Sequence, residues 1–133
     1  MKIAKQKVFS VLIAIVLILS VTSVVFATEH TFERTHVDSN MWTFITSPSK
    51  STFSTTGDLR ITNLYTADGS NSNYRYLYAK ATDNGSSVLA QKGYTTEVPI
   101  PAGYQSVGSY VRLYLMGHDP RLDCKAFGTW SVH

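Results

Sequence analysis

Residues 110–116 read Tyr-Val-Arg-Leu-Tyr-Leu-Met (YVRLYLM), and this stretch decides the fold class. Aliphatic residues alternate in it with Arg112 and Tyr114. A period of two residues is typical of a β-strand that buries one face. We therefore expect Arg112 and Tyr114 to face outward from such a strand. The side chains expected to face the core are Val111, Leu113 and Leu115.

The same alternation recurs after residue 27, in short segments separated by Gly, Pro, Asn and Asp. Short strands at such regular spacing are typical of antiparallel sandwiches and barrels. We predict an all-β fold, a small antiparallel two-sheet sandwich of about seven or eight strands, with a small barrel as the alternative. The other predicted strands are 41–46, 50–56, 59–66, 74–81, 88–92, 94–100 and 124–132.

Two details of this pattern make local predictions. In the segment 59–66, period two places Leu59, Ile61 and Tyr65 on one face. Asn84-Gly85 lies between two predicted strands, and both residue types tolerate a positive φ angle. We therefore expect a tight hairpin turn there.

The N-terminal segment has the layout of a secretory signal peptide. Three lysines among the first seven residues precede an uninterrupted apolar run at 11–19. Val25 and Ala27 then provide the small-residue pattern that signal peptidase cuts. We predict a signal peptide at 1–27 and a single secreted, extracellular β-sandwich domain at 28–133.

A membrane anchor is the alternative interpretation of this segment. Residues 8–27 come close to the roughly 20 apolar residues that a spanning helix needs. If cleavage fails, the protein stays anchored to the membrane with its domain outside. A membrane is an expected partner only in that case.

The charge balance argues against nucleic acid as a partner. The chain has twelve Lys and Arg residues against nine Asp and Glu, and three of the lysines lie within 1–27. Residues 28–133 therefore carry nine charges of each sign. Neutralising phosphates requires a surplus or a stripe of basic side chains.

Cys124 is the single cysteine, so no disulfide can form within one chain. It can be a small buried apolar residue, or it can join two chains in a disulfide dimer. We favour burial.

No motif for catalysis stands out. The sequence has no Gly-x-Ser-x-Gly elbow, glycine-rich phosphate loop or paired metal-ligand spacing. The loop 68–73 lacks the closing Glu of a calcium loop. We expect no enzyme activity and no cofactor, and we interpret the densest polar cluster as a connection between strands. Its members are His118, Asp119, Asp123 and Cys124.

Cleavage after Ala27 would create one candidate metal site. The new chain would begin Thr28-Glu29-His30. A free amine, two backbone amides and a His at position three can surround copper(II) or nickel(II) with four nitrogens in a square plane. Chance placement of a His at this position is the competing interpretation.

Tyr74, Tyr76 and Tyr78 form the best candidate for a binding surface. Three rings on one strand face can stack on the apolar faces of sugar rings. The alternative is that this face packs in the core or against neighbouring strands. The sequence leaves both interpretations open.

Two short segments carry a resemblance to known proteins. Residues 126–131 (AFGTWS), with the signal layout and the Ser/Thr/Tyr-rich strands, are similar to small secreted proteins of Gram-positive bacteria that have no assigned function. Ser72-Asn73-Tyr74 followed by Ala81-Thr82 resembles secreted bacteriocins of the lactococcin type. The chain lacks the upstream Trp/Gly pattern and the His cluster of those bacteriocins, so the resemblance assigns no residue a role.

These observations lead to two expectations about function. The first is a secreted, non-enzymatic module that binds a glycan or another cell-envelope target through the tyrosine face. The alternative is a secreted antimicrobial or toxin-like effector of the bacteriocin type.

Overall fold

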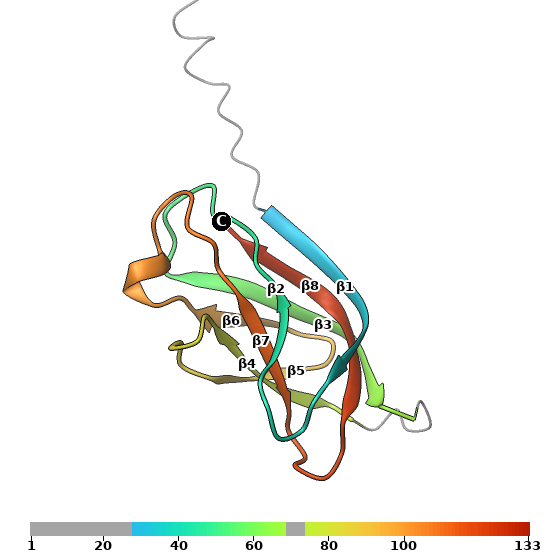
Figure 1. Cartoon of the computed structure of the whole chain (residues 1–133). Helices are drawn as coiled ribbons and strands as arrows, with labels where there is room; N and C mark the ends of the chain where they lie inside the picture. Colours follow the sequence, from blue (N-terminus) through green and yellow to red (C-terminus); the bar gives the residue numbers. More distant parts are fainter. Residues whose placement is uncertain (1–27, 69–73) are drawn as a thin grey trace, which may run out of the picture.

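The computed structural model describes residues 28–68 and 74–133 (Figure 1). The predicted signal peptide at 1–27 lies outside these residues, and so does most of the loop at 68–73. In the described part of the chain, no helix has both the length and the apolar character needed to cross a membrane.

Eight strands and one short 3-10 helix are described. Many of the strand residues are Thr, Val, Tyr or Leu, and β-branched or aromatic side chains fit a pleated surface well. In chain order the elements are β1 (Thr28–Val37), β2 (Thr43–Thr46), β3 (Thr56–Thr66), β4 (Tyr76–Ala81), β5 (Val88–Gln91), β6 (Thr95–Pro99), η1 (Ala102–Tyr104), β7 (Leu113–Gly117) and β8 (Cys124–Val132).

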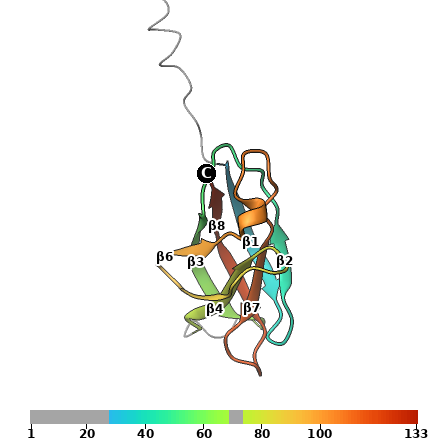
Figure 2. The same cartoon turned by 90° about the vertical axis from the view of Figure 1, so that its left-hand side faces the viewer.

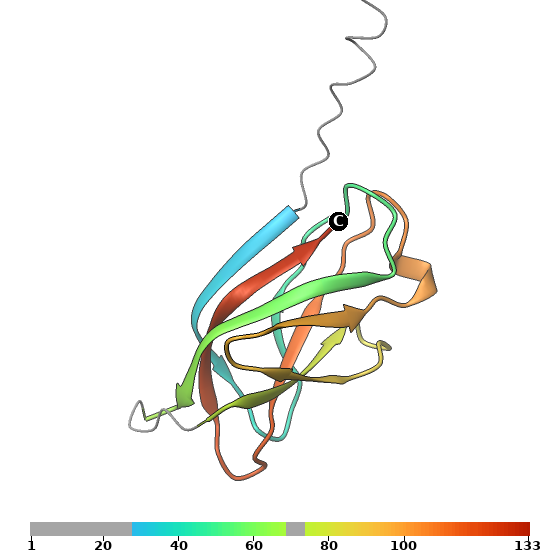
Figure 3. The same ribbon diagram turned by 180° about the vertical axis from the view of Figure 1, so that it is seen from behind.

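The strands form two antiparallel sheets, with the orders β1-β8-β3-β6 and β2-β7-β4-β5. Each early strand pairs with a late one, β1 with β8, β2 with β7 and β3 with β6, and β4 pairs with β5. The chain is therefore one antiparallel ribbon rolled into two layers, which is the jelly-roll form of a sandwich. Figure 2 separates β3 and β6 from β2 and β7, and Figure 3 shows β8 between β1 and β3. The predicted sandwich is confirmed, and the barrel alternative is wrong.

The core lies between the two sheets and is built from alternate strand positions. In β7, Leu113 and Leu115 are fully buried, as expected from the sequence. Trp130 of β8 is also fully buried. Its indole N–H donates to the carbonyl of Val111 at 3.4 Å, which satisfies the one polar group of that ring.

The strands near the N-terminus differ from the prediction in two places. Strand β1 was not predicted, because only Phe32 and Val37 in it are buried apolar residues. It lies at the edge of its sheet and pairs with β8 alone, so it needs little apolar surface. The predicted strand at 50–56 is wrong. Phe53 is 65% exposed there in the loop that precedes β3.

A bulge in β3 changes which residues face the core. The register with β8 shifts between Ile61 and Asn63, and an extra residue reverses the alternation beyond that point. Leu64 is therefore buried in place of Tyr65. The Tyr65 ring packs outside against Phe127, with ring centroids 5.7 Å apart.

Candidate ligand-binding face

The two outer faces of the sandwich differ in chemistry. On the sheet β1-β8-β3-β6, charged and hydroxyl side chains occupy many outward positions, such as Asp58, Arg60 and Thr129. On the sheet β2-β7-β4-β5, the outward positions carry aromatic and other large side chains. We call this second surface the aromatic face. It consists of Trp42, Phe44, Tyr76, Tyr78, Lys80, Leu89, Tyr114, Met116 and His118.

Strand register brings these side chains together. Tyr114 of β7 pairs with Phe44 on one side and with Lys80 on the other. Tyr78 of β4 pairs with Met116 of β7 and with Leu89 of β5. Residues that pair across neighbouring strands project from the same face. The face therefore extends without a break across all four strands of the sheet.

The rings on this face hold one another in place. The His118 ring lies 5.8 Å from the ring of Tyr76 and 5.4 Å from that of Tyr78, measured between centroids. Phe44 meets Tyr114 edge-on, with centroids 5.9 Å apart. Phe44 nevertheless remains 54% exposed. A ligand would thus meet rings that already contact one another.

Lys80 adds a cationic group to the face at the end of β4. Its Nζ lies 4.8 Å from the ring centroid of Trp42 and 5.6 Å from that of Tyr114. Both contacts are within cation–π range. The same Nζ donates a hydrogen bond to the carbonyl of Asp83 at 2.9 Å. These contacts place the Lys80 ammonium over the rings of Trp42 and Tyr114.

Tyr74 does not belong to this face. It precedes β4, it is 8% exposed, and burial raises the pKa of its hydroxyl. That hydroxyl accepts the N–H of Asp119 at 3.1 Å and donates to the carbonyl of Leu122 at 3.2 Å. The predicted row of three tyrosines is therefore divided. Tyr74 forms hydrogen bonds to the β7–β8 loop, whereas Tyr76 and Tyr78 face outward.

The predicted polar cluster near residue 120 is also divided. The side chain of Cys124 is buried in the core, and burial raises the pKa of its thiol to about 12. His118 is exposed on the aromatic face of the other sheet. Cys124 therefore lies inside the sandwich, whereas His118 lies on its outer surface. The predicted burial of Cys124 is confirmed.

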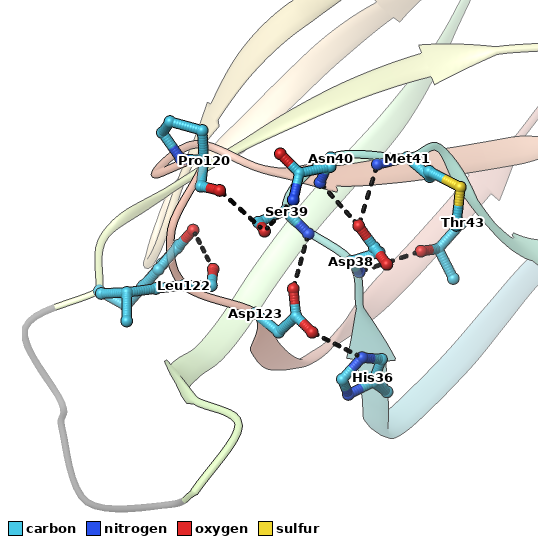
Figure 4. Close-up of polar contacts among 10 residues, drawn as sticks. His36, Asp38, Ser39, Asn40, Met41, Thr43, Pro120, Leu122 and Asp123 are labelled. Atoms are coloured by element: carbon cyan, nitrogen blue, oxygen red, sulfur yellow. Dashed lines mark hydrogen bonds and ion pairs between the residues drawn. The ribbon is translucent and has the colours of Figure 1, made fainter.

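Asp123 belongs to a separate junction between two loops, shown in Figure 4. Its Oδ1 accepts the N–H of Ser39 at 2.9 Å, and its Oδ2 lies 3.3 Å from His36 Nε2. The bond from Ser39 is the main reason why the pKa of Asp123 is lowered. Nearby, Asp38 caps its own turn by accepting the N–H groups of Asn40 and Met41. This junction ties the β1–β2 turn to the β7–β8 loop.

The residues of the predicted copper site lie in β1. Thr28, Glu29 and His30 pair with Val132, Ser131 and Trp130 of β8. The Nδ1 atom of His30 lies 3.1 Å from Thr46 Oγ1. Copper binding stays a prediction, and it would require these three residues to leave the strand. Within 28–68 and 74–133, no group of three or more His, Cys, Asp or Glu side chains could hold a metal ion.

Comparison with protein-family models, curated proteins and solved structures finds no match for this chain. The function must therefore be argued from the surface itself. Trp42, Phe44 and Tyr114 were not identified as site residues from the sequence. The outward position of Tyr114 was expected, and the missing information was which strands lie beside it.

Proposed function

We propose that the protein is a secreted, non-enzymatic module that binds a glycan of the cell envelope through its aromatic face. The observation that carries this proposal is the difference between the two outer faces. Both belong to one sandwich, and neither is needed to cover the core. One is mostly polar and carries a single aromatic pair, Tyr65 and Phe127. The other presents five aromatic side chains, Trp42, Phe44, Tyr76, Tyr78 and Tyr114.

Sugar rings are a good chemical match for this surface. A pyranose has apolar C–H faces, which stack on aromatic rings, and hydroxyl groups around its edge. Tyrosine hydroxyls and the ammonium of Lys80 can form hydrogen bonds with those sugar hydroxyl groups. A chain of sugars lying along β7, from His118 to Arg112, would follow the face for about 20 Å. The equal charges of residues 28–133 favour a glycan over a polyphosphate.

The first experiment measures retention on insoluble peptidoglycan, chitin and cellulose. We expect at least one of these polymers to retain the protein. Tyr78→Ala should then weaken binding about fivefold, because one lost stacking contact is worth about 1 kcal/mol. Tyr65→Ala is the matched control, since Tyr65 is also half-buried and faces outward, but on the polar sheet.

Two results would overturn the proposal. One is the absence of retention on all three polymers. The other is a loss of binding that is equal for Tyr78→Ala and Tyr65→Ala, because the aromatic face would then have no special role. Circular dichroism of both variants ensures that folded proteins are compared.

A further inference from the structure

A pocket of about 370 Å³ lies between the β4–β5 turn and the β6–β7 loop. Its volume is within the usual range for small-ligand sites. Six of its lining residues carry polar or aromatic side chains: Thr82, Asp83, Tyr104, Ser109, Tyr110 and Arg112. We infer that this pocket is a terminal subsite that binds one neutral pyranose at the end of a glycan chain. The inference rests on the proposed function of the aromatic face.

The two tyrosines of the pocket are available to a ligand. Tyr110 is 67% exposed and Tyr104 is 40% exposed. These two rings are therefore not part of the core, and packing there does not account for an aromatic residue at either position. A pyranose that enters the pocket can stack on either of them.

The charged groups of the pocket balance each other. Nη1 of Arg112 lies 3.3 Å from Oδ2 of Asp83, and both side chains are more than half exposed. Together they present N–H donors and carboxylate acceptors at one point. Adjacent sugar hydroxyls both donate and accept, so they match this pair. A free anion would meet the carboxylate as well as the guanidinium, which is why we infer a neutral sugar.

Backbone strain lies at the wall of this pocket. Thr82 has a φ angle of 61°, which is unusual for a β-branched residue. Its N–H donates to the carbonyl of Arg112 at 2.8 Å, and its hydroxyl donates to Asn84 Oδ1 at 2.9 Å. The first bond attaches the β4–β5 turn to Arg112, the residue before β7, and the second lies within the turn. The strained turn thereby keeps Asp83 beside Arg112, and such strain often marks functional sites.

The pocket continues the aromatic face. Arg112 and Tyr114 are two residues apart, so they project from the same side of the chain. Asp83 connects them, because it lies beside Arg112 and its hydrogen bond is the main cause of the raised pKa of Tyr114. Along the face the rings are half-buried or, for Phe44, exposed, whereas at this end the β6–β7 loop adds a wall. A chain of sugars could therefore lie on the face and place its last residue in the pocket.

Nuclear magnetic resonance can test the subsite directly. The small probes are the methyl β-glycosides of glucose and N-acetylglucosamine, and the long probes are cellohexaose and chitohexaose. We expect one of the small probes to shift the amide signals of Thr82, Gly108 and Ser109. The amide signals of Tyr78 and Met116 should move only with the corresponding hexasaccharide.

Variants separate this inference from the proposed function. Tyr110→Ala should weaken binding of the small probe at least tenfold. Tyr94→Ala is the matched control, because Tyr94 is similarly exposed, at 62%, but lies in the β5–β6 turn. Arg112→Gln removes the charge pair and should also weaken binding.

The outcomes are distinct. If a hexasaccharide binds and Tyr78→Ala weakens its binding, but neither glycoside moves the pocket signals, the subsite is refuted and the proposed function stands. An unchanged affinity of Tyr110→Ala for the small probe also refutes the subsite. If none of the four sugars binds, the subsite is refuted, and the proposed function fails as well if peptidoglycan does not retain the protein.

Discussion

Replacing Gly57 by alanine gives the sharpest test of the core packing. A Cβ atom built on Gly57 would lie 2.3 Å from Cη2 and 2.7 Å from Cζ2 of Trp130. Ordinary van der Waals contact begins at 3.4 Å, so the indole would have to move by about 1 Å. Trp130 is fully buried between the sheets, so its ring can move only against the packed core.

The expected cost follows from this geometry. Adding atoms to a well-packed core costs about 1–3 kcal/mol. Moving the indole also threatens its hydrogen bond to Val111, which is long at 3.4 Å. We therefore expect Gly57→Ala to lower the free energy of unfolding by about 2–3 kcal/mol. For a domain of this size, the melting temperature should fall by about 8–12 °C.

Urea unfolding followed by far-ultraviolet circular dichroism measures this cost without relying on tryptophan fluorescence. Gly103→Ala is the control, because Gly103 has nothing within 4 Å of an added Cβ. In the double variant Gly57→Ala/Trp130→Phe, the smaller ring should relieve the clash. The loss of unfolding free energy in the double variant should then be smaller than the sum of the losses in the two single variants, by about 1 kcal/mol or more. A cost for Gly57→Ala below about 0.5 kcal/mol, which is usual for surface sites, would refute the described packing.

Three further predictions concern single groups. The Cys124 thiol, with its pKa raised to about 12, should react with Ellman's reagent only after unfolding; rapid reaction of the native protein, or a disulfide dimer on a non-reducing gel, would contradict its burial. The pKa of Asp123 is lowered in the folded state, so its contribution to stability is present above about pH 4 and is lost as the pH falls through the folded pKa. Asp123→Asn should therefore flatten the acid side of the stability profile measured by urea unfolding, and an unchanged profile would count against the junction. Gly93→Ala should lower the free energy of unfolding by about 1 kcal/mol, because Gly93 has a φ angle of 88° although nothing obstructs an added Cβ. A melting temperature equal to that of Gly103→Ala would contradict this prediction.

Alternation in the sequence is enough to predict much of the fold. The strand around Leu113 and Leu115 is found with the expected faces, because period two follows directly from burial on one side. Alternation does not predict strands whose apolar residues are not arranged by burial of one face. Strand β1 is held by pairing with β8 at a sheet edge, and the bulge after Ile61 adds a residue that no alternation reveals. Edges and bulges depend on a partner strand that lies far away in the sequence.

The candidate site shows the same limit. Tyr76 and Tyr78 could be placed on one strand face, but the sequence alone could not tell whether that face was inside or outside. In the structure that face is outside, because Leu77 and Ala79 at the alternate positions of β4 fill the core. Trp42 and Phe44 join the site only because β2 pairs with β7. Their contribution is a consequence of jelly-roll pairing, which local patterns do not encode.

The same topology bears on the interpretation of the N-terminal segment. The described chain begins at Thr28, which pairs with Val132 at the outer edge of the sheet β1-β8-β3-β6. The aromatic face belongs to the other sheet. The sequence predicts a signal peptide at 1–27, with a membrane anchor as the alternative, and these residues precede β1 of the polar sheet. Glycan binding by the aromatic face is therefore compatible with either, and the retention experiment tests it without first settling how the chain is processed.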